Sequence, residues 1–182
     1  MQSITGLDRR GFLALLSAGV PLATVRAAQA QGTPRRGGVL KVSAASNPSS
    51  LDPTTGGAGS DHIFLYTMFD TLVAFDYATL QPVPGIAEKW SYPDDTTMVL
   101  DIRPGVLFHD GTPCDAAAVK ENLDRNRLDD RSNVKPDLST VTDVTVTGPQ
   151  QVTLKLKQPD TALPLILSDR AGMMSSPTAF KA

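Results

Sequence analysis

The regular alternation of apolar and polar residues near the end of the chain predicts a β-hairpin. Five aliphatic residues alternate with threonines and lysines over residues 141–157: Val144, Val146, Val152, Leu154 and Leu156. A period of two is that of a strand with one buried face, so all five are expected to point inward. A turn at residues 148–151 joins the two strands.

The same period predicts a second hairpin over residues 87–102, with turn residues at 93–95. In its second half, Met98, Leu100 and Ile102 alternate with residues expected to face outward. Two further strands are predicted at residues 39–44 and 106–108, and a short helix at residues 161–167.

Two longer helices are predicted from apolar positions spaced three and four residues apart. The first covers residues 61–75, with Ser60 as its N-cap. The second begins at Thr112 and ends near Leu128, and Asp115 completes a capping box with Thr112. The charges on this second helix are mixed in sign. They predict a solvated face on which Glu121 pairs with Arg125.

A glycine-rich loop over residues 54–61 precedes the first of these helices. It lacks the Gly-Lys-Ser/Thr that follows a phosphate-binding loop, and Asp61 at the helix start would repel an anion. Two interpretations remain open, a flexible loop and a close approach of the backbone to a bound ligand. The candidate ligand contacts are Thr55, Gly56, Gly57 and Ser60.

The first thirty residues have the pattern of an export signal, in which paired arginines precede a moderately apolar segment and a small-residue cleavage site. The residues that carry this pattern are Arg9, Arg10, Phe12, Leu13, Ala28 and Ala30. The pattern resembles a twin-arginine signal, with an ordinary Sec signal or a buried amphipathic helix as alternatives. We therefore predict a signal peptide at 1–30 and a polar linker at 31–37.

Composition narrows the class of protein. The 182 residues are 41% hydrophobic and 20% charged, which is ordinary for one soluble domain. The net charge of −2 offers no basic surface for nucleic acid. Cys114 is the only cysteine, so no internal disulfide can form, and it is expected to be a packing residue. The spacing of His62 and His109 supports no metal site, and no cofactor is predicted.

Residues 84–119 resemble the signature region of the extracytoplasmic solute-binding proteins, family 5, of peptide-type ABC importers. The match includes Pro84–Glu88, Trp90, Asp94-Asp95, Gly105-Val106 and Phe108–Thr112. Residues 47–53 resemble the "SLDP" element of the family, and residues 170–177 resemble the strand by which the family's chain returns to the first lobe. The resemblance implies a mixed α/β (α+β) fold of the type II periplasmic-binding-protein class. Residues 38–182 would form an incomplete first lobe with a β-rich accessory subdomain, as the N-terminal part of a longer protein whose second lobe is absent here.

The function that this resemblance implies is capture of a solute in the periplasm. The expected ligand is a peptide or similar small polar solute, and the expected partners are an ABC importer permease in the inner membrane and the Tat export machinery. A monomer without enzymatic activity or nucleic-acid binding is expected. The alternatives are a secreted enzyme and a structural or chaperone-like module that reuses the same lobe.

Overall fold

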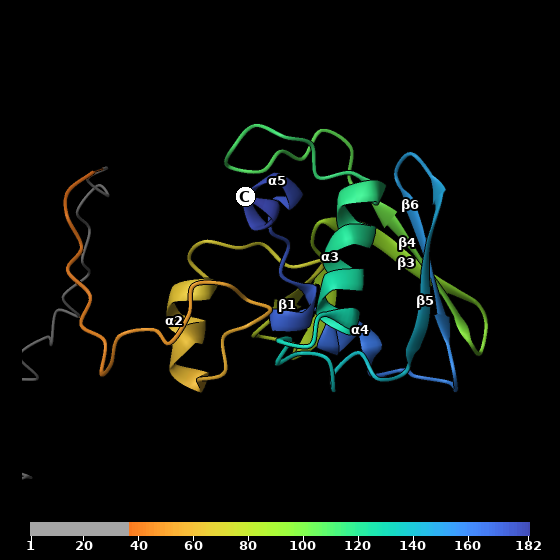
Figure 1. Cartoon of the computed structure of the whole chain (residues 1–182), viewed down its shortest axis with the longest axis horizontal. Coiled ribbons are helices and arrows are strands. Elements are labelled where there is room, and N and C mark those ends of the chain that lie inside the picture. Colours follow the sequence, from red (N-terminus) through yellow and green to blue (C-terminus); the bar gives the residue numbers. More distant parts are fainter. Residues whose placement is uncertain (1–36) are drawn as a thin grey trace, which may run out of the picture. The chain divides into compact units, whose positions relative to one another are not determined.

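A four-stranded antiparallel sheet is the central feature of the protein, whose computed structural model describes residues 37–182 (Figure 1). Its strands lie in the order β3-β4-β6-β5. Their bounds are β3 (Ala87–Asp94), β4 (Thr97–Ile102), β5 (Val141–Gly148) and β6 (Gln151–Leu156). Both predicted hairpins are therefore confirmed, and the pairing of β4 with β6 joins them into one sheet.

The two outer strands of the sheet pair less regularly than the two inner ones. The β3–β4 and β5–β6 pairings each contain two register shifts, whereas β4 pairs with β6 without a shift. The inward residues of the β5–β6 hairpin are buried as predicted, except Val146, which is 40% exposed. It lies on an outer strand beside the turn, where fewer neighbours cover it than cover its cross-strand partner Val152.

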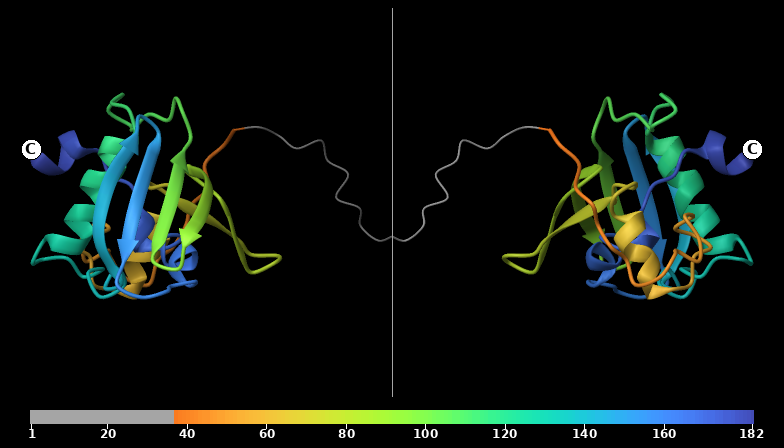
Figure 2. Two further views of the ribbon diagram at one scale, coloured as in Figure 1. Left: turned by 90° about the vertical axis from the view of Figure 1, so that its right-hand side faces the viewer. Right: turned by 90° about the vertical axis from the view of Figure 1, so that its left-hand side faces the viewer.

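One helix, α3 (Ala116–Leu128), packs against β5 and β6 on one face of the sheet (Figure 2). Its apolar side is buried as predicted, and it ends at the predicted residue. The predicted capping box is wrong, because the N-cap is Asp115, whose carboxylate accepts the Ala118 N–H at 3.0 Å. Thr112 instead belongs to the preceding loop, where its N–H and hydroxyl both donate to Asp110.

The helix predicted over residues 61–75 is wrong for most of its length. The chain forms a 3₁₀ turn, η1 (Gly59–Asp61), and one helical turn, α2 (His62–Leu65). Residues 73–76 are instead strand β1 (Val73–Asp76), which pairs with β2 (Gln81–Pro84). The Leu72 N–H also donates to the Gly172 carbonyl at 2.8 Å, so pairing with distant backbone overrides the local helical pattern.

The N-cap predicted at Ser60 is also wrong. Ser60 lies inside η1, and the residue at the cap position is Ala58. Asp61 satisfies this end instead, because its carboxylate accepts the Ala58 N–H at 3.2 Å.

The short strands predicted at 39–44 and 106–108, and the one that the family resemblance implies at 170–177, are wrong. Residues 39–44 form no strand, and Leu40 is 87% exposed. Leu107 and Met173 each make only an isolated bridge, to Pro113 and Thr71 respectively. An apolar run becomes a strand only where a partner completes its hydrogen bonds, and these segments lack a continuous one among residues 37–182.

Short helices close the described chain. The helix predicted at 161–167 is confirmed as α4 (Leu163–Ile166). It is followed by the 3₁₀ turn η2 (Arg170–Gly172) and by α5 (Pro177–Lys181), which has Ser176 as its N-cap. The helices that the structure describes within 37–182 are all too short or too polar to cross a membrane. The predicted signal peptide at 1–30 and residues 31–36 of the predicted linker lie outside the described residues.

Candidate functional site

The glycine-rich loop is a hydrogen-bonded turn built around Asp52. The Asp52 carboxylate accepts the Thr54 N–H and the Thr55 hydroxyl, both at 3.0 Å. The Asp52 carbonyl accepts the Gly56 N–H at 3.0 Å. Two of these bonds pair a backbone N–H that a flexible loop would leave to water, and the third fixes the Thr55 side chain, so the first half of the loop is ordered.

The four candidate contacts divide between the inside and the outside of this turn. Gly56 is buried, and a Cβ there would lie 3.0 Å from an Asp61 carboxylate oxygen and 3.1 Å from an Arg170 guanidinium nitrogen. Gly57 and Ser60 are exposed, and Thr55 is half-buried. Gly56 therefore serves the close packing of the loop, while the other three lie where a ligand could reach them. Their role as ligand contacts stays a prediction.

Asn133 ties the outer side of the loop to the segment after α3. Its N–H donates to the Thr54 carbonyl at 2.9 Å, and its side-chain amide donates to the Thr55 carbonyl at 2.7 Å. The Asn133 amide also lies 3.5 Å from the position of a Cβ on Gly57. Sequence reasoning missed Asn133, because no local pattern links residues 78 positions apart.

Two charged residues support the loop from inside. Asp61 is fully buried and accepts the Ser49 N–H at 2.7 Å and the Ser49 hydroxyl at 2.6 Å. These bonds from Ser49 outweigh the effect of burial and lower the pKa of Asp61 below its ordinary value of 3.8. Arg170 donates to the Pro53 carbonyl through Nε and Nη2, at 3.3 and 3.1 Å.

A polar cluster of His62, Tyr66 and Asp169 brings α2 to the start of η2. One Asp169 carboxylate oxygen lies 3.0 Å from His62 Nε2 and accepts the Tyr66 hydroxyl at 2.8 Å. Burial, followed by the bond to Asp169, raises the pKa of the Tyr66 hydroxyl. Over residues 37–182 no three side chains of His, Cys, Asp or Glu are grouped so as to hold a metal ion.

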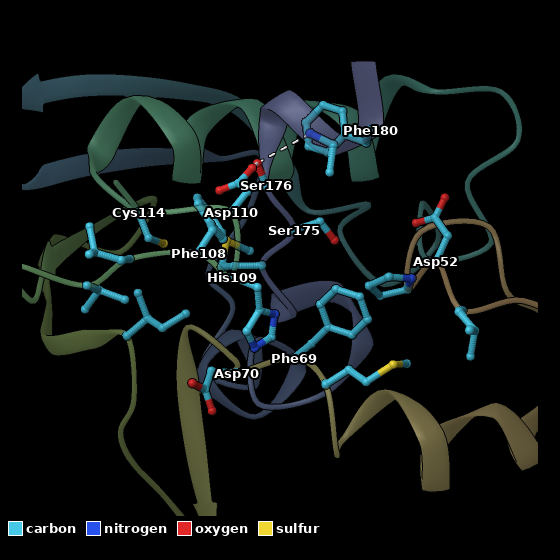
Figure 3. Close-up of a pocket in the computed structure, with 18 of the residues that line it drawn as sticks. Asp52, Phe69, Asp70, Phe108, His109, Asp110, Cys114, Ser175, Ser176 and Phe180 are labelled. Carbon is cyan, nitrogen blue, oxygen red and sulfur yellow. Dashed lines mark hydrogen bonds between the residues drawn. The ribbon is translucent and has the colours of Figure 1, made fainter. Parts of the chain in front are cut away.

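A groove of about 660 Å³ lies beside this loop, between the segments that contain Asp52, Phe69, Phe108 and Phe180 (Figure 3). Figure 3 shows Phe69 and His109 projecting into its centre, as part of an aromatic wall. The lining combines these aromatic rings with charged side chains, among them Asp70, Asp110 and Arg125. A concave surface that brings apolar area and convergent polar groups together can bind a small molecule. Thr55, Gly56, Gly57 and Ser60 are not among the residues that line this groove.

Polar groups at the rim of the groove hold α5 in place. The Ser176 hydroxyl donates to Asp110 at 2.5 Å, and Thr112 donates to the same carboxylate. The bond from Ser176, followed by those from Thr112, lowers the pKa of Asp110. The predicted turn at His109 and Asp110 is confirmed.

Cys114 also lines the groove and is 2% exposed. Burial, reinforced by the charges of Asp115 and Asp70, raises the pKa of its thiol to about 12. The thiol is therefore protonated at neutral pH and acts as a small packing side chain, as predicted.

We expect the carboxylate of Asp110 to contribute stability that acid removes. Its pKa is lower in the folded chain than the ordinary 3.8, so the contribution is complete above about pH 4 and is lost as the pH falls through the folded value. Asp110→Asn should lower the melting temperature at pH 6, and the difference from the unsubstituted protein should close in acid. Melting temperatures from pH 6 to pH 2 would test this, with Asp95→Asn in the exposed β3–β4 turn as the control. A difference that is independent of pH would contradict it.

Residues 81–181 match the model of the bacterial extracellular solute-binding proteins, family 5, middle region. The chain belongs to this family. The matched range includes the whole four-stranded sheet, α3 and the groove residues from Ile86 onward.

This family 5 protein is similar to two curated relatives. It is 32% identical over 142 residues to the glutathione-binding protein GsiB of Salmonella paratyphi A, covering 77% of this chain and 28% of that protein. It is 30% identical over 158 residues to a probable peptide ABC transporter periplasmic-binding protein, y4tO, of Sinorhizobium fredii, covering 86% of this chain and 29% of that protein. The chain thus spans less than a third of the length of these relatives.

The fold is shared with solved structures of binding proteins. The murein tripeptide binding protein MppA of Escherichia coli superposes with a TM-score of 0.67 at 18% identity, over 74% of this chain and 30% of that protein. The expected fold, mixed α/β of the type II periplasmic-binding-protein class, is therefore confirmed.

Proposed function

We propose that this family 5 protein is the periplasmic solute-binding component of an ABC importer. The observation that carries the proposal is the family match over residues 81–181. The names of the relatives, a glutathione-binding protein and a probable peptide-binding protein, support peptides or similar small polar solutes as its ligands.

The contacts proposed for the solute come from the ordered loop and the groove. Thr55, Gly57 and Ser60 present a hydroxyl or a backbone free of a bulky side chain at positions that solvent reaches. The groove adds the aromatic wall of Phe69 and Phe108. Polar groups on an ordered frame, beside an apolar wall, can orient a small solute and shield it from water. The opposing contacts are proposed to come from a second lobe, as the family resemblance implies.

The partners and the location follow from the same proposal. Arg9, Arg10, Phe12 and Leu13 would direct the chain to the Tat machinery, and a signal peptidase would cleave after Ala30. The protein would then act as a monomer that delivers its solute to an inner-membrane permease. A substitution of both arginines by lysine should abolish export if the Tat route is used, whereas export through Sec would persist.

Ligand binding can be tested by thermal shift with the full-length product of the gene. The panel would contain glutathione, di- and tripeptides, opines and Ni²⁺. A ligand at about 100 times its Kd should stabilise the protein by about 2.7 kcal/mol. Chemical turnover of the stabilising compound would instead favour the enzyme alternative. A protein stabilised by no member of the panel would contradict the proposal and favour a structural module.

A further inference from the structure

Two segments that are far apart in the sequence meet on one side of α3 without the support of a sheet. One is the loop at residues 52–56, which leads to the proposed solute contacts. The other is the segment at residues 170–181, which includes η2 and α5. Neither lies within a strand of the described residues, and Met173 makes only an isolated bridge. Only scattered backbone bonds hold them, such as that from the Met174 N–H to the Asp70 carbonyl at 3.1 Å, and side-chain hydrogen bonds supply the rest.

Asn122 on α3 holds the second segment. Its side-chain amide donates to the Ser175 carbonyl at 2.8 Å, and its side-chain oxygen accepts the Ser175 N–H at 2.9 Å. Both backbone groups of Ser175 are thus paired as they would be beside a neighbouring strand. Asn122 is 3% exposed, and a buried amide is tolerated only when it is satisfied in this way.

Arg125 contacts both segments. The N–H groups of its guanidinium donate to the first segment, and the face of the guanidinium lies over an aromatic ring of the second. Nη1 and Nη2 donate to the two carboxylate oxygens of Asp52, at 3.0 and 2.5 Å, and Nη1 also donates to the Thr54 hydroxyl at 3.0 Å. The guanidinium carbon lies 4.7 Å from the centre of the Phe180 ring. Paired donors to one carboxylate fix its orientation as well as its position, which a single contact would not do.

Asn126 completes the contact, one residue further along the same helix face. Its side-chain oxygen accepts the Thr54 hydroxyl at 2.6 Å, and its amide donates to the Ala171 carbonyl at 3.1 Å. Residues three and four apart on a helix share a face, so Asn122, Arg125 and Asn126 point the same way. Asn126 therefore bridges the two segments directly.

Asp52 itself is held ionised by these contacts. Burial acts to raise its pKa, but the hydrogen bonds from Arg125, Thr54 and Thr55 outweigh it and lower the pKa below its ordinary value. The Asp52 carboxylate thus both accepts the hydrogen bonds that order the glycine-rich turn and binds Arg125.

We propose that Asn122, Arg125 and Asn126 form a polar clasp. This clasp positions the loop at residues 52–56, which leads to the proposed solute contacts, against the segment that includes η2 and α5. The claim that this α3 clasp orders the loop rests on geometry alone. The claim that it affects solute binding rests also on the proposed function. With the clasp intact, the loop is ordered before the solute arrives. Without it, ordering the loop becomes part of the cost of binding, so affinity falls. Arg125 also lines the groove, whereas Asn122 and Asn126 do not and act only through the two segments they hold.

The chain offers a matched pair of arginines for the test. Arg125 and Arg127 lie on the same helix and their side chains are 13% and 15% exposed. Arg127, however, donates to Asp124 at 2.9 Å and to the Thr142 carbonyl at the start of β5. Arg125→Gln and Arg127→Gln therefore remove similar side chains from the two different sides of α3.

Amide hydrogen exchange on the full-length protein measures the loop directly. Arg125→Gln should speed exchange of the Gly56 N–H, which bonds to the Asp52 carbonyl, by about tenfold or more, because charge-assisted bonds are lost. Exchange at Leu100 in β4 should change far less, which separates local opening from general destabilisation. Arg127→Gln should leave the Gly56 rate near that of the unsubstituted protein. Equal Gly56 rates in the two variants would overturn the clasp.

The effect of the clasp on binding is tested by the solute affinity of the variants. The affinity is measured by calorimetry with the compound that stabilises the unsubstituted protein. Arg125→Gln should raise Kd about tenfold, and Arg125→Lys, which keeps the charge but loses the paired donors, should give an intermediate value. An unchanged Kd together with faster Gly56 exchange would overturn the positioning role. An unsubstituted protein that binds no member of the panel would contradict the proposed function, and the exchange comparison would still decide the clasp.

Discussion

Replacing Gly172 with alanine is expected to prevent the protein from folding as described here. A Cβ at this position would lie 1.9 Å from the Leu167 carbonyl oxygen and 2.5 Å from its carbon. Both are backbone atoms, so no side-chain rotation can relieve the overlap. The Gly172 carbonyl also accepts the Leu72 N–H at 2.8 Å, and any shift of this backbone would break that bond. We expect a loss of stability beyond the 1–3 kcal/mol, roughly, of ordinary overpacking.

The control for this substitution is Gly59→Ala in η1. Nothing lies within 4 Å of a Cβ on Gly59, and its backbone does not require glycine. Urea denaturation followed by circular dichroism should give nearly the same midpoint for Gly59→Ala as for the unsubstituted protein. Gly172→Ala should give either insoluble protein or a strongly lowered midpoint, and a normal midpoint would contradict the packing described for η2.

Leu100→Ala is expected to have the second largest effect. Leu100 is fully buried in β4, the strand that pairs with both β3 and β6. Removing a buried leucine side chain loses its transfer free energy and leaves a cavity, at a cost of about 2–5 kcal/mol. The free energy of unfolding in urea would measure this loss.

Val146→Ala provides the comparison within the same sheet. Val146 is 40% exposed on the outer strand β5, so its truncation should cost well under the loss at Leu100. Equal losses at the two positions would show that the centre of the core does not lie between the sheet and α3.

The hairpins were predictable because their signals are local. In each of them the alternating residues and the turn lie within about twenty positions, and the pairing partner is the next segment of the chain. Residues 61–75 were predicted wrongly because not all of their pairing partners are nearby in the sequence. Their helical spacing is real, but Leu72 and Val73 pair with Gly172 and Pro84, which no local pattern reveals.

The candidate site was predictable only in part, for the same reason. The glycine-rich loop was recognised, but its partners Asn133, Arg125 and Arg170 lie far along the sequence. Arg125 was expected to pair with Glu121 on a solvated face, whereas it pairs with Asp52. The signal that could have corrected this is the uncharged pair Asn122 and Asn126, since two amides on the side of a helix that bears Arg125 indicate a buried polar contact.

The irregular pairing of the outer strands has a consequence for the molecule in solution. An incoming strand can extend a sheet only where the edge presents its N–H and C=O groups in an unbroken row. Bulges in β3 and β5 interrupt that row on both sides, while the unbroken β4–β6 ladder stays enclosed between them. The sheet is thereby a poor template for copies of itself, so this part of the chain is protected from edge-to-edge association at high concentration.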